Sequence, residues 1–116
     1  MSQLNEGPIK TFTAAVDIDQ YARVKLDANG ELVLAVATDD ELGVTERPAV
    51  AGRDCPVRLR TSQGTTIFIA STAIAIGNTV YGAAAGKVNV TDTGSLKGTA
   101  LSSTSAGDEY VEVLRS

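Results

Sequence analysis

The chain has no histidine, no tryptophan, a single cysteine, and aromatic residues at only 4% of its 116 positions. Without histidine it lacks the commonest general base and a common metal ligand, and one cysteine makes neither an internal disulfide nor a structural zinc site. No run of about 18 apolar residues occurs, and the first residues lack the pattern of a signal peptide, so membrane insertion is not predicted. Cys55 lies in a valine-rich run and is expected to be a small buried hydrophobe.

The charged residues are spread along the chain rather than concentrated. The formal net charge is −4, and no basic stripe with interleaved aromatic residues occurs, so nucleic-acid binding is not predicted. At 116 residues the chain is expected to form one domain, since two independent cores would each be too small. The scarcity of aromatic residues predicts a single core built of Ala, Val, Ile and Leu. We expect synthesis in the cytoplasm.

Apolar and polar residues alternate with the period of β-strands, and no segment has a sustained helical period, so an all-β fold is predicted. Tyr21–Leu26 alternates cleanly, and Asp27–Gly30 closes a hairpin because Asn-Gly supplies the positive φ of such turns. Glu31–Ala37 is apolar on both faces and is predicted to be a central strand. Further strands are expected at residues 42–46, 57–61, 65–70, 87–90 and 110–114, with Val57, Leu59, Val88 and Val90 facing inward.

Residues 18–60 and 74–115 form an internal repeat, which predicts two similar β units. The offset is 56 residues in the first part and 55 from Gly43 and Gly98 onward. At the final strand, alternation favours aligning Val57 with Val111, which requires an offset of 54 and a deletion in the preceding turn, because a slip of one residue would reverse the two faces. The matching positions are Ile18, Val24, Leu26, Gly30, Leu32 and Leu34 with Ile74, Val80, Gly82, Gly86, Val88 and Val90.

Four short patterns have the composition of functional sites, and each is better explained as a turn or a chance match. Asp92-Thr93-Gly94 matches the tripeptide of aspartic proteases, but only 22 residues follow it and no apolar strand leads into it. Gly82–Lys87 lacks the spacing and the Ser/Thr of a phosphate-binding loop. Asn89–Thr91 matches the N-glycosylation triplet, but such triplets are common by chance and no secretory signal is recognised. Asp39–Glu41 has no calcium-ligand spacing and is expected to be a solvated turn. No catalytic, cofactor-binding or metal-binding residue is predicted.

The order of turn glycines and aliphatic strands is distinctive over almost the whole chain. Across residues 12–115 it resembles the small capsid cement, or head-decoration, proteins of tailed bacteriophages. The segments that carry the resemblance are residues 21–26, 42–45 and 51–52 in the first half and residues 75–81, 86–88, 98–101, 106–108 and 111–114 in the second.

The resemblance implies a compact β-tulip or β-clip-like small barrel, built from two similar β units, with an extended N-terminal arm at residues 1–11 and a single β domain at 12–116. It implies a structural virion protein without enzymatic activity or cofactor. Such a protein binds the major capsid protein on the outer surface of the expanded capsid, stabilises the shell, and associates as a trimer at threefold or quasi-threefold positions. The capsid contacts implied for the arm are Leu4, Pro8, Ile9 and Phe12.

Two alternatives remain open from the residues alone. The first is a small β-clip-type binding module for a glycan or a protein partner, although the chain has no Trp and only three Tyr to stack on sugar rings. The second is a dimeric aspartic protease around Asp92, which the sequence disfavours.

Overall fold

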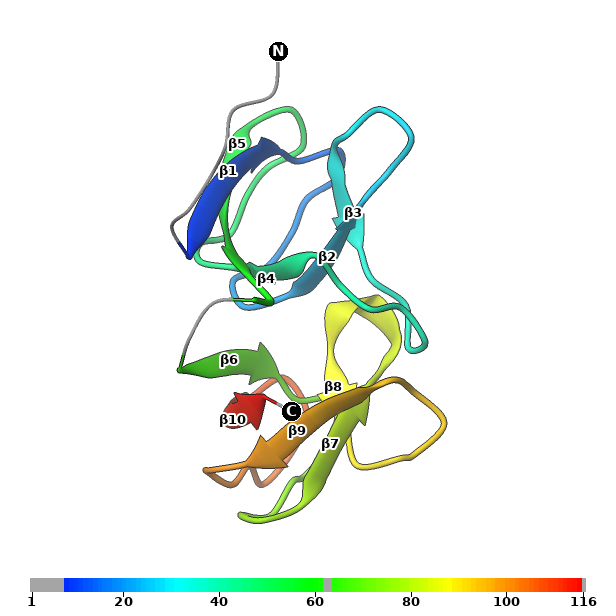
Figure 1. The fold of residues 1–116 in the computed structure, drawn as a ribbon, viewed down its shortest axis with the longest axis vertical. Helices are drawn as coiled ribbons and strands as arrows, with labels where there is room; N and C mark the ends of the chain where they lie inside the picture. Colours follow the sequence, from blue (N-terminus) through cyan, green and yellow to red (C-terminus); the bar gives the residue numbers. More distant parts are fainter. Residues whose placement is uncertain (1–7, 62–63, 116) are drawn as a thin grey trace.

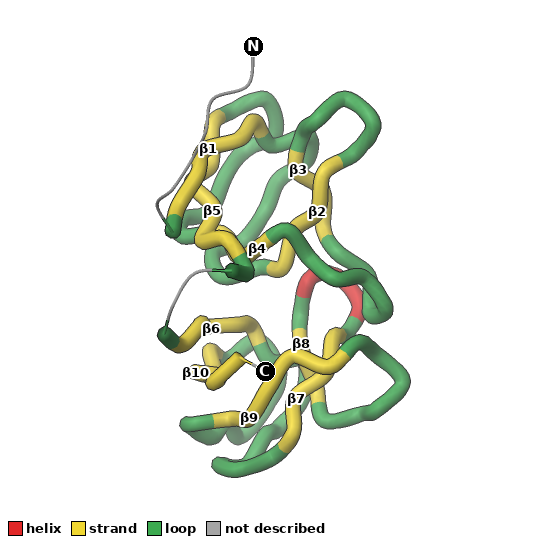
Figure 2. The backbone as a smooth tube through the Cα atoms, in the orientation of Figure 1, coloured by secondary structure: helices red, strands yellow, loops and turns green. Residues whose placement is uncertain are grey.

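The computed structural model describes residues 8–61 and 64–115, and within them the chain forms ten strands in two antiparallel five-stranded sheets (Figure 1). The two sheets follow one another along the longest axis of a molecule that measures 43 × 26 × 22 Å (Figure 1). One short 3-10 turn, η1 (Ala84–Gly86), is the only helical segment of the described residues (Figure 2). The predicted all-β fold class is confirmed. The strands are β1 (Ile9–Thr13), β2 (Arg23–Leu26), β3 (Leu32–Leu34), β4 (Gly43–Thr45), β5 (Asp54–Leu59), β6 (Thr65–Ile69), β7 (Thr79–Gly82), β8 (Val88–Asn89), β9 (Leu96–Ala100) and β10 (Tyr110–Arg115).

The two sheets have equivalent topology, which confirms that the fold is built from two similar units. The order is β1-β5-β4-β2-β3 in the first unit and β6-β10-β9-β7-β8 in the second. Phe12 pairs with Cys55 in the first sheet, as Phe68 pairs with Val111 in the second. Each strand therefore has a counterpart in the other unit, and the counterparts can be assigned residue by residue from the pairing.

The pairing corrects the expected alignment of the last strand. Val57 pairs with Thr45 in the first unit, and Val113 pairs with Ala100 in the second, so the counterpart of Val57 is Val113 and not Val111. The offset between the two units returns to 56 at this strand, because the turn before β10 is one residue longer than the turn before β5. A deletion was expected there instead. The alternation of inward and outward side chains was predicted correctly, since the error is an even number of residues.

The ends of several strands differ from the prediction. The segment Glu31–Ala37 was expected to be a central strand, but it forms only the short strand β3 at the edge of its sheet. The reason is that the residues after Leu34 leave the sheet and reach the second unit, where Ala37 O accepts the backbone N–H of Ser95. Val90 was expected to face inward, but it follows the end of β8 and is exposed. β1 begins at Ile9, inside the range expected for the arm, and pairs with β5 from that residue onward.

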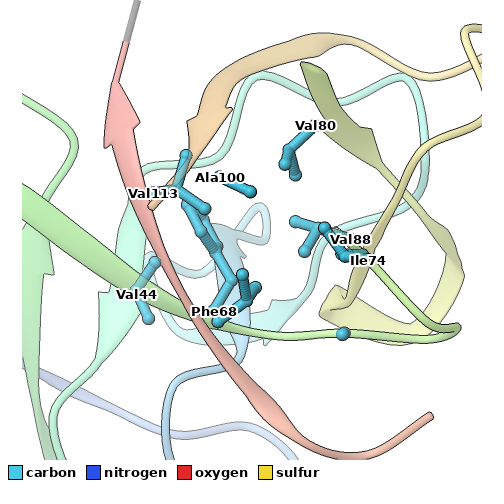
Figure 3. Packing of buried hydrophobic residues seen from close by; sticks show 9 residues of the cluster. Val44, Phe68, Ile74, Val80, Val88, Ala100 and Val113 are labelled. Atoms are coloured by element: carbon cyan, nitrogen blue, oxygen red, sulfur yellow. The ribbon is translucent and has the colours of Figure 1, made fainter. Parts of the chain in front are cut away.

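The buried side chains form two interlocked clusters instead of the single core that was expected. Val44 of the first unit lies among the inward residues of the second unit, next to Phe68 (Figure 3). In return, Ile69 of the second unit packs in the cluster of the first. Tyr21 packs against both clusters, so the two units bury hydrophobic surface against each other as well as within themselves.

Candidate functional site

The residues predicted to contact a capsid are separated by the structure into exposed and inward-facing positions. Leu4 lies outside the described residues. Pro8 is exposed, its carbonyl accepts the N–H of Leu59 at 2.8 Å, and the neighbouring Ile9 is 42% exposed on the outer face of β1. Phe12 is half-buried and packs against the cluster of the first unit. Of the described members of this set, Pro8 and Ile9 are therefore exposed, and Phe12 is only partly accessible.

The acidic turn Asp39–Glu41 is not a solvated turn as expected. Asp40 is largely exposed, but the Glu41 side chain is fully buried. Asp39 lies between these extremes: it forms an ion pair with Lys25 at 2.8 Å and accepts the backbone N–H of Val36 at 2.8 Å. The turn is held by these contacts, and its third carboxylate points into the boundary between the two units.

Glu41 is the centre of a buried ionic cluster that joins the two units. Its Oε1 lies 3.3 Å from Arg23 Nε and 2.5 Å from Lys97 Nζ, and its Oε2 lies 2.7 Å from Arg115 Nη2. The Arg23 and Lys97 side chains are 0% and 2% exposed. Arg23 and Glu41 belong to the first unit and Lys97 and Arg115 to the second, so the cluster crosses the boundary.

The guanidinium of Arg23 uses its remaining donors on backbone carbonyls from both sides of the boundary. Nη1 donates to Ala83 O at 3.0 Å and to Lys87 O at 2.9 Å. Nη2 donates to Val36 O and Asp39 O, each at 3.0 Å. A fixed fork of donors suits such a set of convergent acceptors. The glycine loop around η1 thus presents carbonyl oxygens to a cation, which is the opposite polarity to a phosphate-binding loop.

The charges of the cluster determine the ionisation of Glu41. Burial is the largest single influence on its pKa and opposes ionisation, but the hydrogen bond from Lys97 and the charges of Arg115 and Lys97 together outweigh it. The pKa of Glu41 is therefore lowered and the side chain is a carboxylate at neutral pH. With its oxygens engaged by three cations inside the protein, Glu41 is arranged to hold the units together rather than to react.

The other predicted motifs bring no reactive groups together. Asp92 lies in an exposed turn and lines a shallow polar hollow with Asn78 and Tyr81. Cys55 is fully buried, and burial, opposed by the nearby charge of Arg47, raises the pKa of its thiol. Among residues 8–61 and 64–115, no three His, Cys, Asp or Glu side chains form a group that could hold a metal ion. The described part of the chain also contains no helix of the length and hydropathy needed to span a bilayer.

The outer face of the second sheet is an extended, mostly exposed surface of apolar and threonine side chains with one carboxylate, that of Glu112. Leu114 pairs with Thr65 on one side and with Thr99 on the other, and Thr99 pairs with Thr79, so these four lie in one row across the sheet. Leu114 is 52% exposed and Leu96 is 55% exposed. We call this surface the open face, and its members are Thr65, Ile67, Thr79, Leu96, Thr99, Leu101, Glu112 and Leu114.

Sequence reasoning missed both the ionic cluster and the open face. Alternation placed Arg23 on the outer face of its strand, which is correct, but it does not show that the second unit covers that face. A signal was present in the internal repeat, because Arg23 stands where the second unit has Thr79, and Lys97 stands where the first unit has Leu42. At these two positions, a charge that is present in one copy and missing in the other coincides with the boundary.

Two comparisons with known proteins found matches, one to a family and one to a solved structure. The model of a family described as phage cement protein matches residues 4–115. Among solved structures, the chain is similar to the head fiber gp8.5 N base of bacteriophage phi29, with a TM-score of 0.75 and 18% identity over 93% of this chain and 92% of that one. At this identity the likeness shows a shared fold. No curated protein matches the chain by sequence.

Proposed function

Because the chain belongs to the phage cement protein family, we propose that it binds the outer surface of the expanded phage capsid, through the major capsid protein, and stabilises the shell. The observation that carries the proposal is the family match over residues 4–115, which includes both units and most of the expected arm. The proposed role is structural and non-enzymatic. Its location is the virion, after synthesis in the host cytoplasm.

The buried joint between the units supports this role. A protein that stabilises a shell carries load between its contacts, and halves that share buried charges and interlocked side chains resist separation at their boundary. Arg23 and Glu41 from one unit and Lys97 from the other are fully or almost fully buried in that joint. Moving one unit alone would expose or separate these charges, which is costly.

We place the capsid contact at the N-terminal segment that leads into β1. Pro8 and Ile9 are exposed there, and β1 is one of the two edge strands of its sheet. Leu4, which precedes them, is proposed to contact the capsid as well, whereas Phe12 supports the first cluster from within. Several copies bound as a trimer at a threefold or quasi-threefold position would turn modest contacts of this kind into tight attachment.

The test is co-sedimentation with cement-free expanded heads and with unexpanded heads, counting bound copies per capsid subunit. The wild type is expected to saturate at a fixed ratio on expanded heads only. Ile9→Asp is expected to lower the affinity about tenfold or more, since burying an isoleucine contributes about 1.5–3 kcal/mol and a charge must be desolvated in its place. Ile76→Asp is the matched control, because Ile76 is 68% exposed on a loop of the second unit.

A second measurement separates attachment from stabilisation. Heads saturated with the protein are heated beside bare heads, and the temperature of disruption is recorded by light scattering. A higher disruption temperature is the expected result. Absence of binding to expanded heads would contradict the whole proposal, and binding without any change in disruption temperature would leave a decoration protein that does not stabilise.

A further inference from the structure

The contact between the two units, which we call the internal joint, covers part of the outer face of the first sheet. The second sheet has an equivalent row of positions on its own outer face. In the first unit the row across the sheet is Ile9, Arg58, Val44 and Arg23, read from their pairing. In the second unit the corresponding row is Thr65, Leu114, Thr99 and Thr79. The two rows have the same strand order and the same register, so they are equivalent surfaces.

The part of the first row formed by Val44 and Arg23 is covered by the second unit, whereas Ile9 at its edge is exposed. Val44 is 2% exposed within the second cluster, and Arg23 is 0% exposed within the ionic cluster. The surface that receives this row is the rim of the second unit, formed by Phe68, Lys97 and Arg115. Arg115 lies over the Phe68 ring, with its guanidinium carbon 5.2 Å from the ring centroid, and Lys97 bonds to Glu41.

Among the described residues, most of the second row is exposed, with Thr65 half-buried at its edge, and the rim of the first unit is only partly covered. The counterparts of Phe68, Lys97 and Arg115 in the first unit are Phe12, Leu42 and Leu59, each of them half-buried. We call these three residues the open rim. One molecule therefore carries a second copy of each of the two surfaces that meet in the internal joint.

The two uncovered surfaces have changed their chemistry together. In the internal joint, Arg23 and Glu41 meet Lys97 and Arg115, and all four are charged. On the open face the counterparts of Arg23 and Glu41 are Thr79 and Leu96, and on the open rim the counterparts of Lys97 and Arg115 are Leu42 and Leu59.

These changes fit the two open surfaces to each other. An open face without a carboxylate at the position of Glu41 would leave the cations of the ionic rim unpaired, but it suits a rim with leucines at the positions of Lys97 and Arg115. The absence of charge at these matched positions is thus a form of complementarity, and Glu112 is the one carboxylate of the open face.

We propose that the open face of one copy binds the open rim of a second copy of this chain, in the arrangement that the first unit already makes with the second. Such a contact joins two different surfaces of identical molecules. It therefore gives a closed ring when the rotation from one copy to the next divides a full circle evenly, and an open filament when it does not. The internal joint specifies which surfaces meet and not the angle between copies. A rotation of one third of a circle from each copy to the next gives a trimer. In this respect the inference rests on the trimer proposed above.

The first test is a charge exchange that rebuilds the internal ion pair between two copies. Leu96→Glu places a carboxylate at the position of Glu41, and Leu59→Arg places a guanidinium at the position of Arg115. Self-association is measured by sedimentation velocity across a concentration series. Leu96→Glu alone is expected to raise the dissociation constant about tenfold or more, and adding Leu59→Arg is expected to restore association. Val50→Glu, at a residue 64% exposed on a loop of the first unit, is the control and should change nothing.

The second test remains informative if the free protein is monomeric or if Leu59→Arg does not fold. The double variant Leu96→Cys with Leu59→Cys is treated with a short bis-maleimide, in concentrated solution and on saturated heads. The expected product is a linked dimer whose peptides join position 59 of one chain to position 96 of another. Cys55 is fully buried and should stay unmodified.

Two results would overturn the inference. One is a Leu96→Glu variant that associates like the wild type, and the other is the absence of a 59–96 link both in solution and on heads. The capsid function is judged separately, because Ile9→Asp is expected to impair head binding and to leave association in solution intact. A protein that self-associates through these surfaces but does not bind heads would remove the capsid proposal and keep the interface.

Discussion

Replacing Glu41 by glutamine tests whether the buried ionic cluster holds the two units together. Glutamine keeps the size of the side chain but removes the only carboxylate that touches Arg23, Lys97 and Arg115 at once. Two of these cations are fully or almost fully buried, and the Arg115 side chain is 17% exposed, so they cannot regain water without opening the boundary. Removing one partner of a buried ion pair costs about 3–5 kcal/mol.

This loss is large compared with the stability of a domain of this size. The free energy of unfolding of small proteins is about 5–15 kcal/mol, so the variant is expected to retain about half to two thirds of a mid-range value of about 10 kcal/mol. With an unfolding entropy of about 2.1 cal/mol/K per residue, the expected decrease in melting temperature is on the order of 15 °C.

The assay is urea unfolding followed by circular dichroism, with Asp40→Asn as the matched control. Asp40 is the neighbouring acid, it is 75% exposed, and its carboxylate lies 3.9 Å from Lys97 Nζ, so its loss is expected to cost at most about 1 kcal/mol. Adding Lys97→Met to Glu41→Gln removes one stranded cation, and the double variant is expected to be more stable than the sum of the single losses predicts. A Glu41→Gln variant within about 1 kcal/mol of the wild type, or an equal loss in Asp40→Asn, would refute the reasoning.

Three further outcomes follow from the same contacts. A Cβ on Gly82 would lie 2.9 Å from the Arg23 guanidinium and would also meet a backbone carbonyl of the first unit. Gly82→Ala is therefore expected to lower the free energy of unfolding, measured in urea, by about 1–3 kcal/mol. The loss should be larger than in Gly30→Ala, where the added Cβ meets no other atom and only the positive φ of the turn opposes the change. Burial raises the pKa of the Cys55 thiol, so Ellman's reagent is expected to react at the rate of unfolding; an immediate reaction of the native protein would contradict its burial. The pKa of Glu41 is lower in the folded protein than its ordinary value of about 4.3, so the contribution of Glu41 to stability is complete above about pH 4.3 and is lost as the pH falls through the folded pKa. Urea midpoints measured between about pH 7 and pH 3 should show this decline in stability, and the decline should be smaller in Glu41→Gln.

The parts of the fold that depend on neighbouring residues were predictable from the sequence. The hairpin closed by Asp27–Gly30 is present, with Gly30 at φ 76° and Val24 paired with Leu34. Strong β-formers at Thr65–Ile69 and alternation at Tyr110–Arg115 likewise form strands. These features follow from turn chemistry and from the two-residue period, both of which act over a few residues.

The joint between the units was not predictable in the same way. Arg23 and Glu41 lie on outward-facing or turn positions, and such charges are normally solvated. Their burial depends on a sheet that begins more than 20 residues later in the chain, and local patterns do not contain that information. The position of Tyr21 has the same origin: it adopts φ 62° where its counterpart is Gly77 at φ 88°, and the turn tolerates it while its ring packs against both clusters.

Differences between the two units are therefore more informative about function than their similarities. The shared positions, such as Val24 with Val80 or Phe12 with Phe68, maintain the same sheet in both copies and would do so in any protein with this fold. The positions that differ lie in the row that one unit buries and the other exposes, where Arg23 corresponds to Thr79 and Val44 to Thr99. Leu96, the counterpart of Glu41, is 55% exposed, whereas Leu42 and Leu59, the counterparts of Lys97 and Arg115, are half-buried, and Leu42 packs against the first cluster. The part of these leucines that remains exposed is explained when both open surfaces are contacts of the assembled protein, and this ties the internal repeat to the capsid role proposed for the whole chain.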